Sequence, residues 1–95
     1  MRVFKTRENN FRAFEVKSSK YINKLANIKI LYKSFHFESY YENCIITSFN
    51  KGKKKYPELY KCDKRDFYIR FLSCDNILKS AIVNSNDIDV FIELI

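Results

Sequence analysis

The segment 87–95 alternates strictly between aliphatic and other side chains. The aliphatic residues are Ile88, Val90, Ile92 and Leu94, and the residues between them are Asp89, Phe91 and Glu93. A period of two is that of a β-strand, because successive side chains of a strand point to opposite faces of the sheet. The pattern predicts a half-buried strand, and therefore a sheet that must be covered on at least one face.

Three other segments have the composition of strands. Residues 67–72 are the clearest, with Phe67, Ile69 and Phe71 expected to face the core and Tyr68, Arg70 and Leu72 the other side. Residues 35–49 are rich in aromatic and β-branched types, which favour one long strand or two short ones. Residues 11–16 are short and apolar, and they also favour a strand.

Two segments have helical spacing. Tyr21, Leu25, Ile28 and Tyr32 recur at intervals of three or four, which predicts a helix over residues 19–31 capped by Ser18 or Ser19. Asp75 can cap a second helix, whose buried face would consist of Ile77, Leu78, Ala81 and Ile82, and which would end at residues 84–86. The resulting order, β-α-β-β-α-β, predicts an α+β fold: a single two-layer sandwich of ferredoxin-like topology with an antiparallel sheet.

Length and composition indicate one ordered domain over residues 1–95. Hydrophobic residues make up 46% of the chain, which is enough for one packed core. We expect residues 1–10 to form an edge strand or a loose arm. These residues lack the apolar stretch of a secretory signal. No apolar run approaches the roughly 18 residues that span a bilayer, so we expect no membrane association. Three cysteines without close spacing favour reduced thiols and a cytoplasmic protein, or a nuclear one in a eukaryotic host.

Positive charge is concentrated in one half of the chain. Residues 1–70 contain 17 basic and seven acidic side chains, whereas residues 71–95 contain one basic and four acidic ones. The segment 50–66 holds the single Gly and the single Pro and is predicted to be a basic loop. Its cations are Lys51, Lys53, Lys54, Lys55, Lys61, Lys64 and Arg65, and its aromatic residues are Tyr56 and Tyr60. Clustered cations beside tyrosines suit a phosphate backbone with bases available for stacking, although a solvated lysine loop has the same composition.

The segment 64–71 partly resembles the central strand of the RNA-recognition motif, a family in which outward aromatic side chains stack on bases. Lys64, Tyr68, Ile69, Arg70 and Phe71 match that pattern, whereas residues 65–67 depart from it. The resemblance implies that Tyr68 is a base-stacking residue, with Arg70 beside it.

Catalytic and metal-binding arrangements are not indicated. His36 is the single histidine and has no identifiable third group to orient it as a base. Cys44, Cys62 and Cys74 are at least twelve positions apart, unlike the close pairs of structural zinc sites, so we expect buried thiols. The acidic residues at 58, 63 and 66 fit no metal-nuclease spacing. We therefore expect no catalytic residue, no metal and no cofactor.

These observations favour a non-enzymatic module that binds a polyanion, most plausibly the backbone of RNA or DNA. The contacts would come from the basic loop together with Tyr68 and Arg70. The chain has thirteen Lys and five Arg, which suits backbone contact better than base readout. The alternative is a small inhibitor or adaptor that binds an acidic or nucleic-acid-binding surface of a protein partner. The sequence is rich in residues with AT-rich codons, which suggests a viral, phage or mobile-element origin.

Overall fold

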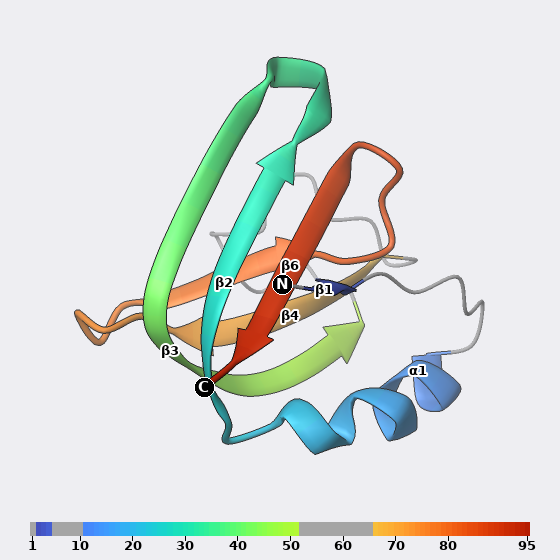
Figure 1. Cartoon of the computed structure of the whole chain (residues 1–95). Helices are drawn as coiled ribbons and strands as arrows, with labels where there is room; N and C mark the ends of the chain where they lie inside the picture. Colours follow the sequence, from blue (N-terminus) through green and yellow to red (C-terminus); the bar gives the residue numbers. More distant parts are fainter. Residues whose placement is uncertain (1, 5–10, 52–65) are drawn as a thin grey trace.

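The computed structural model describes residues 2–4, 11–51 and 66–95 (Figure 1). One α-helix, two short 3-10 helices and six strands follow one another in these ranges. They are β1 (Arg2–Phe4), α1 (Phe11–Ser18), η1 (Ser19–Tyr21), β2 (Leu25–Tyr32), η2 (Lys33–Phe35), β3 (Phe37–Lys51), β4 (Phe67–Leu72), β5 (Leu78–Ile82) and β6 (Ile88–Leu94). The described part of the chain is therefore mostly sheet, with a single α-helix.

The six strands form one antiparallel sheet in the order β1-β6-β2-β3-β4-β5. The long strand β3 pairs with β2 through its first half and with β4 through its second half. The pairing register shifts between Ala26 and Ile28 and again between Ile46 and Ser48. Such irregularities bend a strand and increase its twist. The sheet consequently curls, so that β4 and β5 cross behind β2 and β6 (Figure 1).

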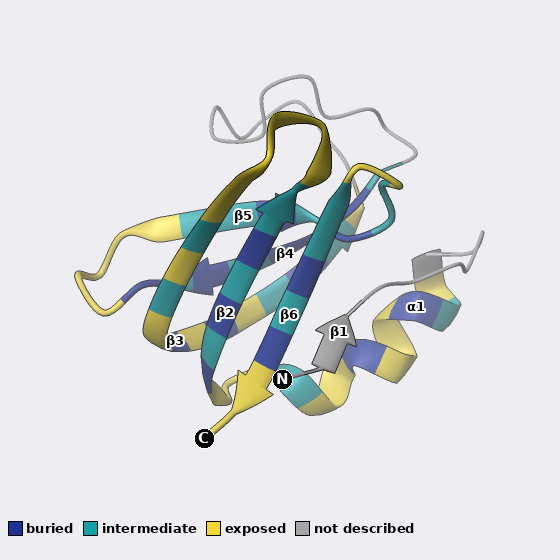
Figure 2. Cartoon of the chain, turned by 45° about the horizontal axis from the view of Figure 1, so that its top comes forward, coloured by how far each residue is buried: buried dark blue, intermediate teal, exposed yellow. Residues whose placement is uncertain are grey.

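The hydrophobic core lies inside this curl. Alternate residues of β2 point inward: Ala26, Ile28 and Ile30 are all buried. The helix α1 lies across the open end of the curled sheet, beneath the second half of β3 (Figure 1), and turns a buried side toward the sheet (Figure 2). Its Phe14 is 2% exposed and packs against Phe49 and Phe67. One aromatic side chain of α1 thus closes this end of the core.

The predicted ferredoxin-like fold is wrong, because both predicted helices are mainly strands. Residues 25–32 form β2, whose buried residues Ala26, Ile28 and Ile30 have the period of a strand, and this strand pairs with β3 and β6. Asn23, with φ of 64°, separates this strand from η1. The α-helix lies instead at residues 11–18, where a strand was predicted. Tertiary pairing has overridden the local pattern in both places.

The second predicted helix, after Asp75, is a turn followed by β5. Asn76 has φ of 62°, a left-handed conformation that interrupts a helix and is common in turns. Leu78–Ile82 then pairs with β4 along its whole length. A five-residue strand is too short for periodicity to distinguish it from a helix.

The other predicted strands are confirmed. β4 has the predicted bounds, and β6 and β3 cover most of the predicted segments 87–95 and 35–49. Phe67, Ile69 and Phe71 are buried in the core as expected. At the N-terminus, β1 is an edge strand paired with β6, and residues 5–10 lie outside the described ranges.

Candidate functional site

Most of the predicted binding loop lies outside the described residues. This applies to Lys53, Lys54, Lys55, Tyr56, Tyr60, Lys61, Lys64 and Arg65. Lys51, the first cation of the segment, is exposed at the end of β3, opposite Phe67 of β4 in the strand register. Asp66 immediately precedes β4 and is half-buried. The structure thus places the two ends of the basic segment next to each other on neighbouring strands.

The predicted base-stacking role of Tyr68 is wrong. Its side chain is 0% exposed, although it alternates with Phe67 and Ile69 and therefore lies on the other face of β4. A base cannot stack on a ring that has no accessible surface. Arg70, on the same face of β4, is half-buried, and its Nε atom is fully buried. The Arg70 side chain is therefore less available to a ligand than an exposed side chain would be.

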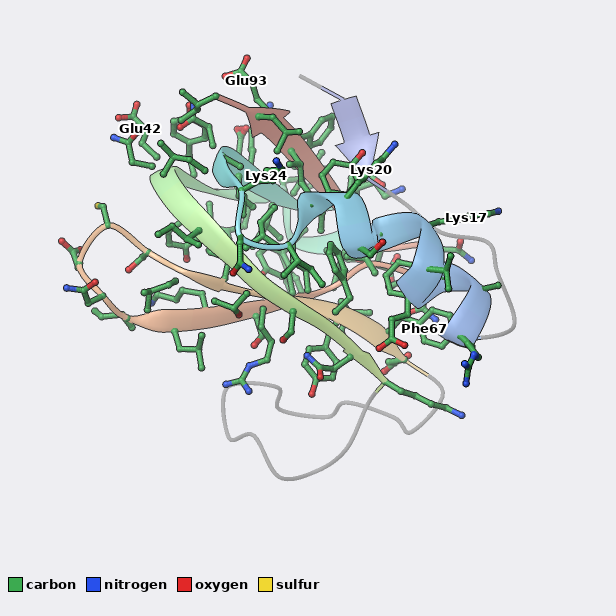
Figure 3. The ribbon with its side chains drawn as sticks, turned by 90° about the horizontal axis from the view of Figure 1, so that it is seen from below. Lys17, Lys20, Lys24, Glu42, Phe67 and Glu93 are labelled. Atoms are coloured by element: carbon green, nitrogen blue, oxygen red, sulfur yellow. The ribbon has the colours of Figure 1, made fainter. Side chains whose placement is uncertain are left out.

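A second group of cations lies on α1 and the segment that follows it. It consists of the exposed side chains Arg12, Lys17, Lys20 and Lys24, with Glu15 as the single acidic residue between them. Lys17 is in the last turn of α1 and Lys20 is in η1, while Lys24 directly precedes β2. We call these four side chains the α1 basic surface (Figure 3). The sequence contained a signal for this surface, since four cations fall within thirteen residues. The predicted helix over 19–31 included only Lys20 and Lys24, so the four cations were not recognised as one group.

The α1 basic surface lies at the same end of the molecule as Lys51. Phe14 of α1 stacks on Phe67 with ring centroids 5.1 Å apart, and Phe67 is the register partner of Lys51. Tyr21 of η1 contacts Phe49, two residues before Lys51, with centroids 6.4 Å apart. These aromatic contacts bring two basic segments together that are separated by more than 25 positions in the sequence.

Lysines elsewhere on the described surface are engaged locally. Lys29 forms an ion pair with Glu38 at 3.2 Å, and Lys33 forms one with Asp89 at 3.5 Å. Lys79 lies over the ring of Tyr41 at 5.8 Å. Neither Lys20 nor Lys24 forms an ion pair within residues 2–4, 11–51 and 66–95, although Lys20 lies over the ring of Tyr21 at 5.4 Å, a contact that leaves its charge unneutralised. Their charges are consequently available to an external anion.

The thiols differ from the prediction that all are buried. Cys44 is buried and Cys74 is exposed, while Cys62 lies outside the described ranges. Burial, with a smaller electrostatic contribution from Cys74, raises the pKa of the Cys44 thiol to about 11. A thiol with this pKa is protonated and a poor nucleophile at neutral pH. His36 is exposed in the turn after η2.

A cavity of about 240 Å³ lies where β3 approaches the turn between β4 and β5. Its lining combines aromatic, acidic, basic and thiol groups: Tyr40, Tyr41, Glu42, Ser73, Cys74, Asp75, Ile77 and Lys79. The Cys74 sulfur is 4.0 Å from an Asp75 carboxylate oxygen. Among the described residues, no group of three or more His, Cys, Asp or Glu side chains is arranged to hold a metal ion.

Comparisons with protein-family models, with curated proteins and with solved structures give no match to this chain. Within the described part of the chain, no helix has the length and apolar character needed to cross a membrane.

Proposed function

We propose that this protein is a non-enzymatic module that binds a polyanion, and that the polyanion is the phosphate backbone of RNA or DNA. The observation that carries the proposal is the α1 basic surface, where Lys20 and Lys24 have no ion-pair partner within the described residues. The formal net charge of +7 agrees with an anionic ligand.

The proposed contacts come from two segments. Lys17, Lys20 and Lys24 contact phosphates from the α1 side, and Lys51 extends the same surface at the end of β3. The sequence of residues 53–65 adds six cations that continue from Lys51. Tyr56 and Tyr60 remain the proposed base-stacking residues, and Tyr68 is excluded by its burial.

The composition of the cations supports backbone contact without base readout. Lysine is a flexible point charge, whereas the two-pronged contacts that identify a guanine are made most often by arginine. The chain has thirteen Lys and five Arg, and Arg70 is half-buried. We therefore expect similar affinities for different nucleotide sequences of the same strandedness.

The proposal is tested by titrating single- and double-stranded RNA and DNA at several salt concentrations. Phosphate binding releases condensed counterions, so the logarithm of affinity falls with the logarithm of salt by about 0.7 to 0.9 per phosphate neutralised. Replacing Lys20 and Lys24 with Ala is expected to reduce this slope by about 1.5 and to weaken all sequences alike.

The matched control replaces Lys29 and Lys33 with Ala, because it removes the same charge from lysines that already form ion pairs. We expect this control variant to keep most of the wild-type dependence of affinity on salt concentration. Absence of binding to all four nucleic acids at about 100 mM salt would contradict the proposal. Binding to an acidic protein that survives nuclease treatment would instead identify carboxylates as the polyanion.

A further inference from the structure

The face of β2, β3 and β6 that is turned away from the core is not covered by any described helix. We call it the outer face; it is seen from the front in Figure 1. The helix α1 lies at the open end of the curl instead (Figure 2). A sheet face with apolar side chains is normally covered by a helix or by a second sheet, so the composition of the outer face decides whether a cover is missing.

The outer face carries apolar side chains on both sides of Asn27 along β2. Its apolar side chains are Leu25 and Leu31 of β2, Tyr40 and Ile45 of β3, Phe91 of β6, and Ile95 directly after β6. Leu25, Tyr40, Ile45 and Ile95 are between 42% and 66% exposed. Leu25, Ile45 and Ile95 are neighbours across strands, since Leu25 is the register partner of Ile45 and accepts a backbone hydrogen bond from Ile95 at 3.1 Å. Tyr40 is the register partner of Lys29, farther along β2. Contiguous exposed apolar residues of this kind mark interaction surfaces.

The single lysine at the centre of this face is neutralised within the chain. Lys29 pairs with Tyr40 on one side and Phe91 on the other in the strand register. Its Nζ lies 4.8 Å from the centroid of the Phe91 ring and 3.2 Å from a Glu38 oxygen. Lys29 therefore adds its apolar stem to the centre while its charge is already satisfied.

Two exposed carboxylates border the same face without an ion pair in the described part of the chain. They are Glu42 and Glu93, which lie away from Lys17 and Lys20 in Figure 3. Asn27 links their strands, because its side chain donates to Glu93 and accepts from the Asn43 backbone, both at 3.1 Å. Lys24, which also lacks an ion pair among the described residues, directly precedes Leu25. The border of the outer face is thus acidic toward β3 and β6.

We infer that the outer face is the docking site for a basic amphipathic helix of a partner protein. An α-helix is about 10 Å wide with its side chains, which matches two to three strands spaced by about 4.8 Å. Leucines on one side of such a helix would cover Leu25, Ile45 and Tyr40, and lysines on its flanks would meet Glu42 and Glu93. The acidic border disfavours a nucleic acid at this face, so this site is separate from the α1 basic surface.

A second copy of this chain does not provide the required helix. The apolar side of α1 is engaged in its own core through Phe14, which is 2% exposed. On the rest of α1, Val16 is the single large apolar side chain that is exposed in the described structure. Among the described residues, no helix of a second copy fits this role, so the proposed partner is a different protein.

The probe is a synthetic amphipathic helix of about 18 residues, made of leucine and lysine, titrated against the folded protein. The matched control peptide carries glutamate in place of each lysine. We expect saturable binding of the lysine peptide, with amide shifts in the NMR spectrum concentrated at Leu25, Ile45 and Ile95. Ile45→Lys is expected to weaken this binding by at least about tenfold. Glu42→Gln combined with Glu93→Gln preserves the apolar side chains of the outer face and is expected to weaken binding by about threefold or more.

Val16→Lys adds the same charge to α1 and is expected to leave the affinity within about twofold. Circular dichroism establishes that each variant is folded. The inference is overturned by a lack of saturable binding, by equal binding of the glutamate peptide, or by an unchanged affinity of both outer-face variants. Concentration-dependent self-association that Ile45→Lys abolishes would also overturn it, because a second copy would then occupy this face.

Discussion

Phe14 in α1 stacks almost parallel to Phe67 in β4, with ring centroids 5.1 Å apart and planes inclined by 17°. Phe14 also meets Phe49 of β3 edge-on at 5.5 Å. A helix of eight residues is too short to be stable alone. The position of α1, and of the lysines that follow it, therefore depends on this aromatic cluster.

Phe14→Ala is expected to lower the free energy of unfolding by about 3–5 kcal/mol, because it leaves a cavity between β3 and β4. Denaturant titration measures the change, and Val16→Ala, on the exposed side of the same helix, is expected to stay within about 0.5 kcal/mol. An unchanged midpoint for Phe14→Ala would show that α1 is not anchored to the sheet.

Phe71→Ala is expected to cost a similar amount, about 3–5 kcal/mol, since Phe71 is 0% exposed and its ring lies 5.3 Å from that of Tyr41. The control is Phe35→Ala, which makes the same chemical change at a side chain that is 81% exposed. Equal midpoints for the two variants would refute the assignment of Phe71 to the core.

Replacing Lys53, Lys54 and Lys55 with Ala tests the basic segment that begins at Lys51. If these lysines contact phosphates, the salt dependence of nucleic-acid binding should become shallower by about two units. The affinities for different sequences should fall in parallel, because backbone contacts carry no sequence information. An unchanged slope, together with a reduced slope for the Lys20 and Lys24 variant, would confine binding to the α1 basic surface.

The buried Cys44 thiol predicts a specific loss of stability at high pH. Its folded pKa of about 11 lies above the ordinary thiol value of 9.0, so the folded state retains the proton more strongly than the unfolded state. This contribution is fully present below about pH 9 and is lost as the pH rises through about 11. Denaturant midpoints at pH 8 and pH 10.5 should therefore differ more for the wild type than for Cys44→Ala. The same difference in both proteins would assign the effect to tyrosines and lysines.

Sequence patterns located the strands whose alternation is long or unambiguous. β6 and β4 were found because one set of alternate residues is aliphatic or aromatic and buried, as with Val90, Ile92 and Phe71. β2 was mistaken for a helix because Tyr21, Leu25, Ile28 and Tyr32 fit a helical period, and only pairing with β3 and β6 decides between the two.

The candidate site was harder to predict for a related reason. Alternation placed Tyr68 on the face of β4 opposite Phe67, but it carries no information on whether that face is accessible. Lys17, Lys20 and Lys24 were visible as cations, yet their common surface arises only because α1 and η1 precede β2 and are held by Phe14 and Tyr21. Both the burial of Tyr68 and the common surface of these lysines result from long-range packing, which a local sequence pattern does not reveal.

The strand order also sets a constraint on folding during synthesis. β6 lies between β1 and β2, so the first strand has no partner in the sheet until residues 88–94 have left the ribosome. The β2–β3 and β4–β5 hairpins can form earlier, because each joins strands that are close in the chain. Until β6 arrives, the inner edge of β2 and the apolar residues Ile28 and Ile30 remain uncovered. A nascent chain stalled before residue 88 should therefore be the species of this protein most prone to aggregate or to recruit a chaperone.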